Sequence, residues 1–399
     1  MGRKDLILPV YYIGCPVLDD AALRQNDALA QAIAARQWED WREMRHELLT
    51  TPLVGKALTR LATQICNALE RIGTPVPVSP APQTPTLIVD SMHRGDFVTI
   101  SEAIAAATPG TRILVRPGVY QEALVMDKAL EIIGDGKPGD VVVQAKGKDV
   151  LRFETTTGRV ANLTLQQTGD GICVGALITQ GRLEMDDCDI TSRSLSCVEI
   201  RNDADPRLRR CRIHNGKNNG VMFCANGQGT LEDCDIFGHA LCGVVVKEGG
   251  NPTIRCCRIQ DNKRAGVLVC ENGRGVLEEN DIFGNAQHGV EIREGGNPIL
   301  RHNRIHDNKL SGVDVHTNER GRLEDNDIIS NAGCGAAISG DSRTTLRNNR
   351  INRNTYNAVW IHDGGGGIFE DNDLRDNVKD AWDIAADCKN KVTRARNLQ

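Results

Sequence analysis

Large aromatic side chains are scarce in this sequence: Phe, Trp and Tyr together make up 4% of its 399 residues. A globular core of this size usually depends on such side chains. The chain also lacks an apolar run of the roughly 18 residues that indicates a membrane-spanning helix. Its net charge of −5 gives no excess of basic residues for a nucleic acid. We therefore expect neither a membrane nor a nucleic-acid partner.

The 14 cysteines do not form the patterns of metal or redox sites. The sequence contains no Cys-x-x-Cys pair and no Cys/His finger spacing, so it predicts neither a metal ion nor a cofactor. Disulfide frameworks are typical of short secreted chains rather than of long ones. We therefore expect reduced thiols and a cytoplasmic protein.

The sequence is instead dominated by a repeat with a period of 23 residues, which runs without an insertion for nearly 200 residues. Apolar residues recur at this spacing in several columns. One column comprises Ile190, Ile213, Ile236, Ile259, Ile282, Ile305, Ile328 and Ile351. A second comprises Val198, Val221, Val244, Val267, Val290 and Val313. A third comprises Leu208, Leu231, Ile254, Leu277, Leu300, Leu323 and Leu346.

The repeat carries the motif Gly-Val-x-Val/Ile, in which β-branched residues alternate with variable ones as in a β-strand. Gly, Asn and Asp separate the apolar segments where tight turns are needed. A leucine-rich repeat would carry the LxxLxLxxN signature, which is absent. The sequence therefore predicts an all-β solenoid, a single-stranded right-handed parallel β-helix over residues 86–399. Each 23-residue repeat forms one coil, and the coils stack at about 4.8 Å.

One polar column is interpreted as a structural ladder inside the coils. Asn tolerates the left-handed turn conformation and can hydrogen-bond to its stacked copies, while Cys serves as a small buried substitute. Disulfides between stacked cysteines are disfavoured because their Cβ vectors run parallel. The column comprises Cys188, Cys211, Cys234, Cys257, Asn280, Asn303, Asn326, Asn349 and Asn372.

Two charged columns change sign from one coil to the next. One begins Asp189, Arg212, Asp235 and the other Asp186, Arg209, Glu232. Stacked like charges would repel, whereas alternation makes neighbouring coils attract and disfavours a slip by one coil. The alternating signs produce no net field, so we interpret both columns as structural.

The start of the predicted solenoid has its own pattern. Residues 101–107 form a short amphipathic segment, with Ser101 as the expected N-cap, that would cover the open end of the first coil. The motif Gly95-Asp96-Phe97-x-Thr99-Ile100-x-Glu102-Ala103-Ile104, followed by Pro117-Gly118-x-Tyr120-x-Glu122, resembles the opening of the pectin methylesterase and pectate lyase superfamily. The later coils resemble carbohydrate-binding and sugar-hydrolase repeats, as in F-box only and Shc-binding proteins. The resemblance implies a β-helix fold.

The resemblance does not extend to the catalytic residues of these families. The DFIFG and LGRPW segments of pectin methylesterases are absent. The Asp-Asp and Gly-His-Gly motifs of polygalacturonases have only fragments here, at Asp186-Asp187 and His288-Gly289. Because one fold hosts many activities, function has to be argued from the site.

The two variable positions of the strand motif point away from the core and form a strand face. It is predicted to present an apolar patch, a polar cluster and an aromatic residue to a protein or a glycan. No catalytic residue is assigned; the candidates are Glu291 and Asp314 on adjacent coils, with His316 as a base. The predicted binding residues are Met222, Val245, Leu268, Glu291, Arg293, Asp314, His316, Trp360 and His362.

Residues 1–73 lack the repeat and predict a small α/β segment, with a strand at 6–13 and helices at 21–36 and 52–71. Residues 74–85 form a Pro-rich linker. The run Ile7–Ile13, Asp27-x-Leu29-Ala30 and Gln37-x-x-Asp40-Trp41-Arg42-x-x-Arg45 resemble the back half of a bacterial TIR domain. The front half, with the catalytic glutamate, is missing, so NAD hydrolysis is not predicted.

Three hypotheses for function follow. The first is a non-catalytic recognition or scaffold protein whose strand face binds a protein or a glycan, in TIR-linked signalling. The second is a carbohydrate-active enzyme, a polysaccharide lyase or glycoside hydrolase, that works on the strand face. The third is a structural rod that forms homo-oligomers through its ends or its N-terminal segment.

Overall fold

The computed structural model describes residues 10–11, 39–40, 84–137, 139–316 and 320–399. The chain divides into two units, residues 1–83 and residues 84–399. In the first, β1 (Val10–Tyr11) pairs in parallel with β2 (Glu39–Asp40). β1 falls within the predicted strand. The predicted helices, the linker up to residue 83 and most of the TIR-like motif lie outside the described residues.

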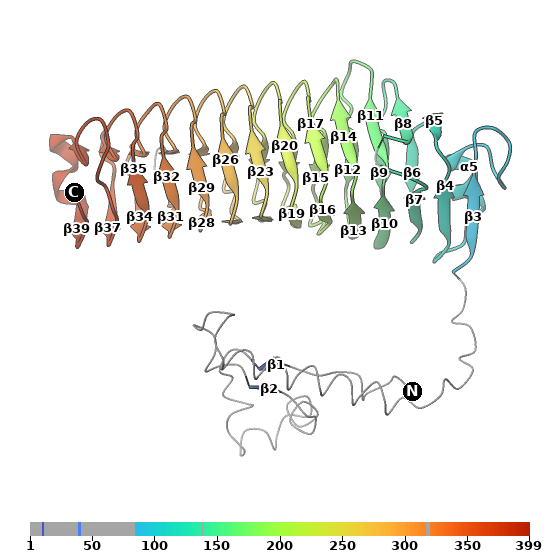
Figure 1. The fold of residues 1–399 in the computed structure, drawn as a ribbon, viewed down its shortest axis with the longest axis horizontal. Helices are drawn as coiled ribbons and strands as arrows, with labels where there is room; N and C mark the ends of the chain where they lie inside the picture. Colours follow the sequence, from blue (N-terminus) through green and yellow to red (C-terminus); the bar gives the residue numbers. More distant parts are fainter. Residues whose placement is uncertain (1–9, 12–38, 41–83, 138, 317–319) are drawn as a thin grey trace, which may run out of the picture. The chain divides into compact units, whose positions relative to one another are not determined.

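The second unit is a parallel β-helix whose coils follow one another along a rod (Figure 1). Adjacent strands pair at the predicted spacing; Ile236, for example, lies opposite Ile213 and Ile259. The prediction of a parallel β-solenoid is therefore confirmed, and the first strand of the solenoid is β3 (Thr86–Val89). Within residues 84–399 the coils form three parallel sheets, which run along the three sides of the rod.

The first sheet has 14 strands and carries the Leu208 column on its inner side. Its strands are β3 (Thr86–Val89), β4 (Arg112–Val115), β7 (Glu131–Gly134), β10 (Thr157–Ala161), β13 (Arg182–Asp186), β16 (Arg207–Arg209), β19 (Thr230–Glu232), β22 (Thr253–Arg255), β25 (Val276–Glu278), β28 (Ile299–Arg301), β31 (Arg322–Glu324), β34 (Arg343–Arg347), β37 (Gly366–Glu370) and β39 (Val392–Ala395).

The second sheet has 11 strands and carries the Ile190 column. Its strands are β5 (Gly118–Gln121), β8 (Val141–Ala145), β11 (Thr164–Gln167), β14 (Asp189–Ser192), β17 (Arg212–His214), β20 (Asp235–Phe237), β23 (Arg258–Gln260), β26 (Asp281–Phe283), β29 (Arg304–His306), β32 (Asp327–Ile329) and β35 (Arg350–Asn352).

The third sheet has 12 strands, and its outer side is the predicted strand face. Its strands are β6 (Leu124–Met126), β9 (Leu151–Phe153), β12 (Ala176–Ile178), β15 (Val198–Ile200), β18 (Val221–Phe223), β21 (Val244–Val246), β24 (Val267–Val269), β27 (Val290–Ile292), β30 (Val313–Val315), β33 (Ala336–Ile338), β36 (Val359–Ile361) and β38 (Trp382–Ile384).

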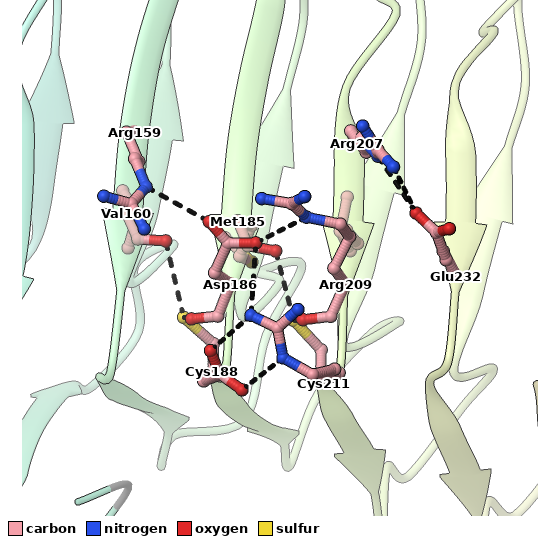
Figure 2. Close-up of polar contacts among 12 residues, drawn as sticks. Arg159, Val160, Met185, Asp186, Cys188, Arg207, Arg209, Cys211 and Glu232 are labelled. Carbon is pink, nitrogen blue, oxygen red and sulfur yellow. Dashed lines mark hydrogen bonds and ion pairs between the residues drawn. The ribbon is translucent and has the colours of Figure 1, made fainter. Parts of the chain in front are cut away.

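The polar column of Cys and Asn residues lies buried inside the coils. Asn303 donates its Nδ2 to Oδ1 of Asn326 at 2.9 Å and to the backbone oxygen of Leu277 at 2.8 Å. Cys211 replaces this donor with its thiol, which lies 3.5 Å from the backbone oxygen of Met185 (Figure 2). The ladder therefore satisfies backbone carbonyls that the turn leaves without a strand partner.

Left-handed backbone conformation does not explain the asparagines of the ladder, contrary to the expectation from the sequence. The left-handed conformation falls on the residue before each ladder position: Asp187 has a φ of 53°, Arg210 51° and Asp325 56°. Asn326 itself is not left-handed. Asn is therefore selected at the ladder for its hydrogen bonds and not for its backbone freedom.

A second asparagine ladder, which the sequence analysis missed, lies at the turn before the third sheet. Its members are buried and donate to one another in the same way, except that the last one, Asn377, is half-buried and donates to backbone oxygens. It explains the glycine of the Gly-Val-x-Val/Ile motif: a Cβ on Gly243 would lie 2.7 Å from the oxygen of Gly266 and 2.8 Å from Nδ2 of Asn262. The ladder comprises Asn262, Asn285, Asn308, Asn331, Asn354 and Asn377.

Both ends of the solenoid differ from the sequence prediction. The helix α5 (Ile100–Ala106) packs against β3, β4 and β6 at the first coils, as expected, but its N-cap is Thr99 and not Ser101. Thr99 and Glu102 form a capping box, and Glu122 accepts the amide of Ile100 at 2.9 Å. At the other end, where no cap was predicted, the 3-10 helix η3 (Ala386–Lys391) packs against β37 and buries Cys388.

The alternating charges pair between coils, as predicted. Asp186 is 1% exposed and accepts hydrogen bonds from Arg209 at 2.7 Å and Arg159 at 3.1 Å (Figure 2). Burial acts to raise the pKa of Asp186, but the hydrogen bonds from these guanidinium groups outweigh it and lower the pKa. Arg350 likewise reaches Asp327 on the preceding coil at 2.7 Å.

Candidate functional site

The apolar patch predicted on the strand face is mostly buried. Val245 is 5% exposed and Leu268 is 8% exposed. They pack with Cys242 and Ala265, from the preceding turns, in a small hydrophobic cluster, and Met222 lies against its edge. The prediction of an exposed patch for a protein partner is therefore wrong for these coils, because the turns fold back over the strand side chains.

The polar cluster does form on the next coils. The register places Glu291 of β27 directly opposite Asp314 of β30. His316 follows β30, and its Nε2 lies 2.5 Å from Oδ2 of Asp314. His288, from the turn before β27, places its Nε2 3.3 Å from the same oxygen. One carboxylate is thus shared by two imidazoles, and sequence reasoning missed the role of His288.

The two members of the Asp314–His316 pair differ in exposure. The side chain of Asp314 is 10% exposed, whereas that of His316 is 45% exposed. The hydrogen bond with Asp314 raises the pKa of His316, burial opposes this, and the charge of Asp314 adds to the rise. Asp314 therefore orients the imidazole and favours its protonated form, while the side chain of His316 remains partly exposed.

Arg293 lies one coil before His316, and its guanidinium group has N–H donors that make no short hydrogen bond. Its guanidinium approaches Glu291 at 3.5 Å and Glu294 at 3.7 Å, which are ion pairs without a short hydrogen bond. Its Nε is buried and has no hydrogen-bond partner among the described residues, and the same holds for Nδ1 of His288. Buried polar atoms are rarely left unpaired, so these atoms indicate a place where water or a ligand binds.

Trp360 and His362 lie farther along the same face. Their rings stack with centroids 3.8 Å apart, and Nδ1 of His362 lies 2.8 Å from Asp363. These two predicted residues therefore contact each other. They lie two coils away from His316.

A cavity of about 920 Å³ opens beside the cluster. It extends from the coil of Asp314 to the coil of Asp383, and its size falls within the range of small-molecule sites. Most of its lining comes from turns, which lie outside the Gly-Val-x-Val/Ile strand motif. The lining residues are Lys309, Leu310, Ser311, Ala332, Gly333, Cys334, Tyr356, Asn357, Trp360, Lys379, Asp380, Trp382 and Asp383.

One group of potential metal ligands occurs among the described residues. The thiol of Cys270 and the carboxylates of Glu271 and Glu294 lie within 4.8 Å of one another. Burial, followed by the charge of Glu271, raises the pKa of Cys270 to about 11, and Lys247 lies 3.6 Å from Glu271. A protonated thiol and a competing ammonium group disfavour a cation, so we assign no metal to this group.

Among the described residues, no helix is long and apolar enough to cross a membrane. In comparisons with known proteins, mouse F-box only protein 10 is 27% identical over 201 residues, which is 47% of this chain and 20% of that protein. The matched part of the chain therefore spans only about a fifth of the length of that relative.

Two solved structures share the fold. The A-module of the Azotobacter vinelandii mannuronan C-5 epimerase AlgE6 superposes with a TM-score of 0.64 at 16% identity, covering 75% of this chain and 92% of that one. A variant of the periplasmic alginate epimerase AlgG superposes with a TM-score of 0.58 at 12% identity. This match covers 79% of this chain and 85% of that one.

The family model described as the right-handed β-helix region matches residues 150–292 and 242–396. These matches cover more than half of the chain and coincide with the coils described above. The chain belongs to the right-handed β-helix family.

Proposed function

We propose that this protein is a polysaccharide-modifying enzyme whose active site is the cluster of Asp314, His316, His288 and Arg293 on the strand face. The observation that carries the proposal is the Asp314–His316 pair, in which a buried carboxylate holds an exposed imidazole at 2.5 Å. A carboxylate that orients a histidine is a recurrent arrangement for general acid–base catalysis. The substrate class follows from the groups around the pair.

His316 is the proton-transfer group in this proposal. Nε2 of His316 is bound to Asp314, and Nδ1 of His316 has no hydrogen-bond partner among the described residues. Nδ1 is therefore the nitrogen that takes a proton from the substrate. Asp314 stabilises the imidazolium that forms, because a nearby negative charge favours the protonated ring.

Arg293 supports a substrate that carries a carboxylate. Its long contacts with Glu291 and Glu294 leave donors for a bidentate bond to a uronate group. A proton on the carbon next to a carboxylate becomes acidic enough to remove only when the developing negative charge is stabilised, and a guanidinium supplies this stabilisation. We therefore propose a polymer of uronic acids as the substrate.

The reaction begins when Nδ1 of His316 removes the proton from the carbon next to the carboxylate. The electron pair of that bond moves into the carboxylate, whose added charge Arg293 stabilises. In one outcome water on the opposite face of the ring donates a proton to this carbon and inverts it, and the hydroxide left behind is neutralised by the proton that His316 releases. In the other, the pair forms a carbon–carbon double bond, the neighbouring glycosidic bond breaks, and the departing oxygen takes the proton that the imidazolium of His316 releases.

The structural neighbours support the enzyme hypothesis more than the recognition hypothesis, since they are named as mannuronan and alginate epimerases. The buried state of Val245 and Leu268 also removes the main argument for a protein-binding patch. A recognition or scaffold role would appear as glycan or protein binding without turnover.

The proposal is tested by incubating the full chain with mannuronan, polygalacturonate and a neutral glucan. Proton NMR follows inversion of the sugar, and absorbance of the unsaturated product follows elimination. We expect turnover of a uronate polymer by the native chain and a loss of at least 100-fold in His316→Gln, the scale of general acid–base catalysis. The matched control is His302→Gln, which changes a histidine at a turn outside the strand face. Equal rates for native chain and His316→Gln, or turnover of none of the polymers, contradict the proposal.

A further inference from the structure

The cavity beside the cluster begins where the proposed active site ends. Ser311 lies one coil after His288, and its backbone oxygen accepts the amide of Gly289 at 3.2 Å. From there the lining passes Cys334 and Trp360 and ends at Asp383. Asp314 and Asp383 are three coils apart, which corresponds to roughly 14 Å along the rod. A ligand that fills the cavity therefore extends away from His316 toward the C-terminal coils.

Aromatic rings form much of this cavity. Trp360 is 38% exposed and Tyr356 is 50% exposed, although aromatic residues are rare in the chain. Lys379 places its Nζ 5.6 Å from the centre of the Tyr356 ring. Nε1 of Trp382 is buried without a hydrogen-bond partner among the described residues. The exposed indole of Trp360 and the exposed phenol of Tyr356 form a surface that fits a ligand with ring faces and hydroxyl groups.

The charges in the cavity balance. Lys309 and Lys379 supply two positive groups, and Asp380 and Asp383 supply two negative groups. Such a lining offers hydrogen-bond donors and acceptors without a strong field of one sign. It favours a polyhydroxylated ligand held by stacking and hydrogen bonds over a small anion held by charge.

We propose that this cavity is a sugar-binding subsite. In it, Trp360 and Tyr356 stack against sugar rings of the polysaccharide that extend from the reacting sugar toward the C-terminal coils of the protein. The inference rests on the proposed function for the identity of the polymer. Trp360 is then a residue that determines the length of substrate that the enzyme prefers. Arg293 binds the carboxylate of the reacting sugar, whereas the cavity binds the ring faces and hydroxyl groups of sugars farther along the polysaccharide.

The test uses mannuronan oligosaccharides of graded length, from disaccharide to octasaccharide, with the full chain and its Trp360→Ala variant. Calorimetry measures binding, and KM is measured separately. We expect Kd and KM for the octasaccharide to rise about tenfold in Trp360→Ala, the effect of losing an aromatic contact. The difference should shrink as the oligosaccharide shortens toward the disaccharide. Trp360→Phe should recover most of the lost affinity, and Val378→Ala, which alters an exposed side chain outside the cavity lining, is the matched control.

Two results separate this inference from the proposed function. If Trp360→Ala binds and turns over every length as the native chain does, the subsite is wrong while the active site stands. If the octasaccharide binds in a manner that depends on Trp360 but is never turned over, the subsite stands and the proposed function fails. If no oligosaccharide binds to the native chain, the subsite is also wrong.

Discussion

The Nε2 atom of His316 lies 2.5 Å from Oδ2 of Asp314, and this contact raises the pKa of the exposed imidazole. Asp314→Asn keeps the size of the side chain but removes its charge. We therefore expect the pKa of His316 to fall in this variant, so that the ring loses its proton at a lower pH than in the native chain. NMR titration of the His316 ring signals measures the change.

Glu291→Gln is the control for that titration. The charge of Glu291 also raises the pKa of His316, but it comes after the hydrogen bond and the charge of Asp314. A smaller fall than in Asp314→Asn is expected. An unchanged His316 titration in Asp314→Asn would show that the short contact does not exist in solution.

A buried histidine makes stability depend on pH. His239 occupies the column of the second asparagine ladder, where its Nδ1 accepts the amide of Gly216 and its Nε2 donates to the oxygen of Ile213. Burial lowers the pKa of His239 to about 4. Because the unfolded ring binds its proton near pH 6.5, stability is complete above that pH and falls toward pH 4, by about 3 kcal/mol in all.

His239→Asn should remove this dependence. Asn262 lies on the next coil and accepts the amide of residue 239 at 3.1 Å, so an asparagine there extends the existing ladder. We expect the melting temperatures of variant and native chain to diverge as the pH falls from 6.5 to 4, with the variant more stable. Parallel curves over this range would contradict the assignment of a neutral buried ring.

The first asparagine ladder should tolerate cysteine better than alanine. Asn326 donates its Nδ2 to Leu300 and Asn349 and accepts from Asn303. Asn326→Ala leaves these buried groups without a partner and should cost about 2–4 kcal/mol of unfolding free energy. Asn326→Cys restores one donor, as Cys211 does in its own coil, and should cost less. Chemical denaturation compares the two, and equal losses would show that filling space matters more than the hydrogen bonds.

The ion pairs of the charged columns should contribute more to the free energy of unfolding where the carboxylate is more deeply buried. Asp186 is 1% exposed, so Arg209→Met removes one of its two main partners and should cost about 1–3 kcal/mol. Asp327 is 41% exposed in its side chain, and Arg350→Met, which breaks its pair, should cost less than about 1 kcal/mol. Thermal unfolding of both variants measures the difference. A larger loss from Arg350→Met would contradict the ranking by burial.

The sequence predicted those structural features that recur in every 23-residue repeat. The inward columns, the first ladder and the pairing of charges all follow from a side chain that recurs at one position in every coil, as at Ile213 and Arg209. Asp314 and His316 were predicted because the variable positions of the strand motif place them on the outward face, next to Glu291 on the adjacent coil. The second ladder was missed because His239 and earlier residues break the asparagine column.

Other features depend on how turns fold over the strands. The burial of Val245 and Leu268 comes from Cys242 and Ala265, which the alternation of strand residues does not reveal. Tyr356 and Lys379 lie in turns, where one residue more or less changes the direction of a side chain. The N-cap shifted from Ser101 to Thr99 because Glu102 completes the capping box only with Thr99.

Proton abstraction by His316 is the central claim, and deuterium exchange tests it most directly. The full chain is incubated in D₂O with mannuronan, and proton NMR and mass spectrometry follow deuterium at the carbon next to the carboxylate. The account predicts deuterium at this carbon, or loss of its proton through elimination, in the native chain and neither in His316→Gln. A polymer that binds to the native chain yet keeps all of these protons would contradict it.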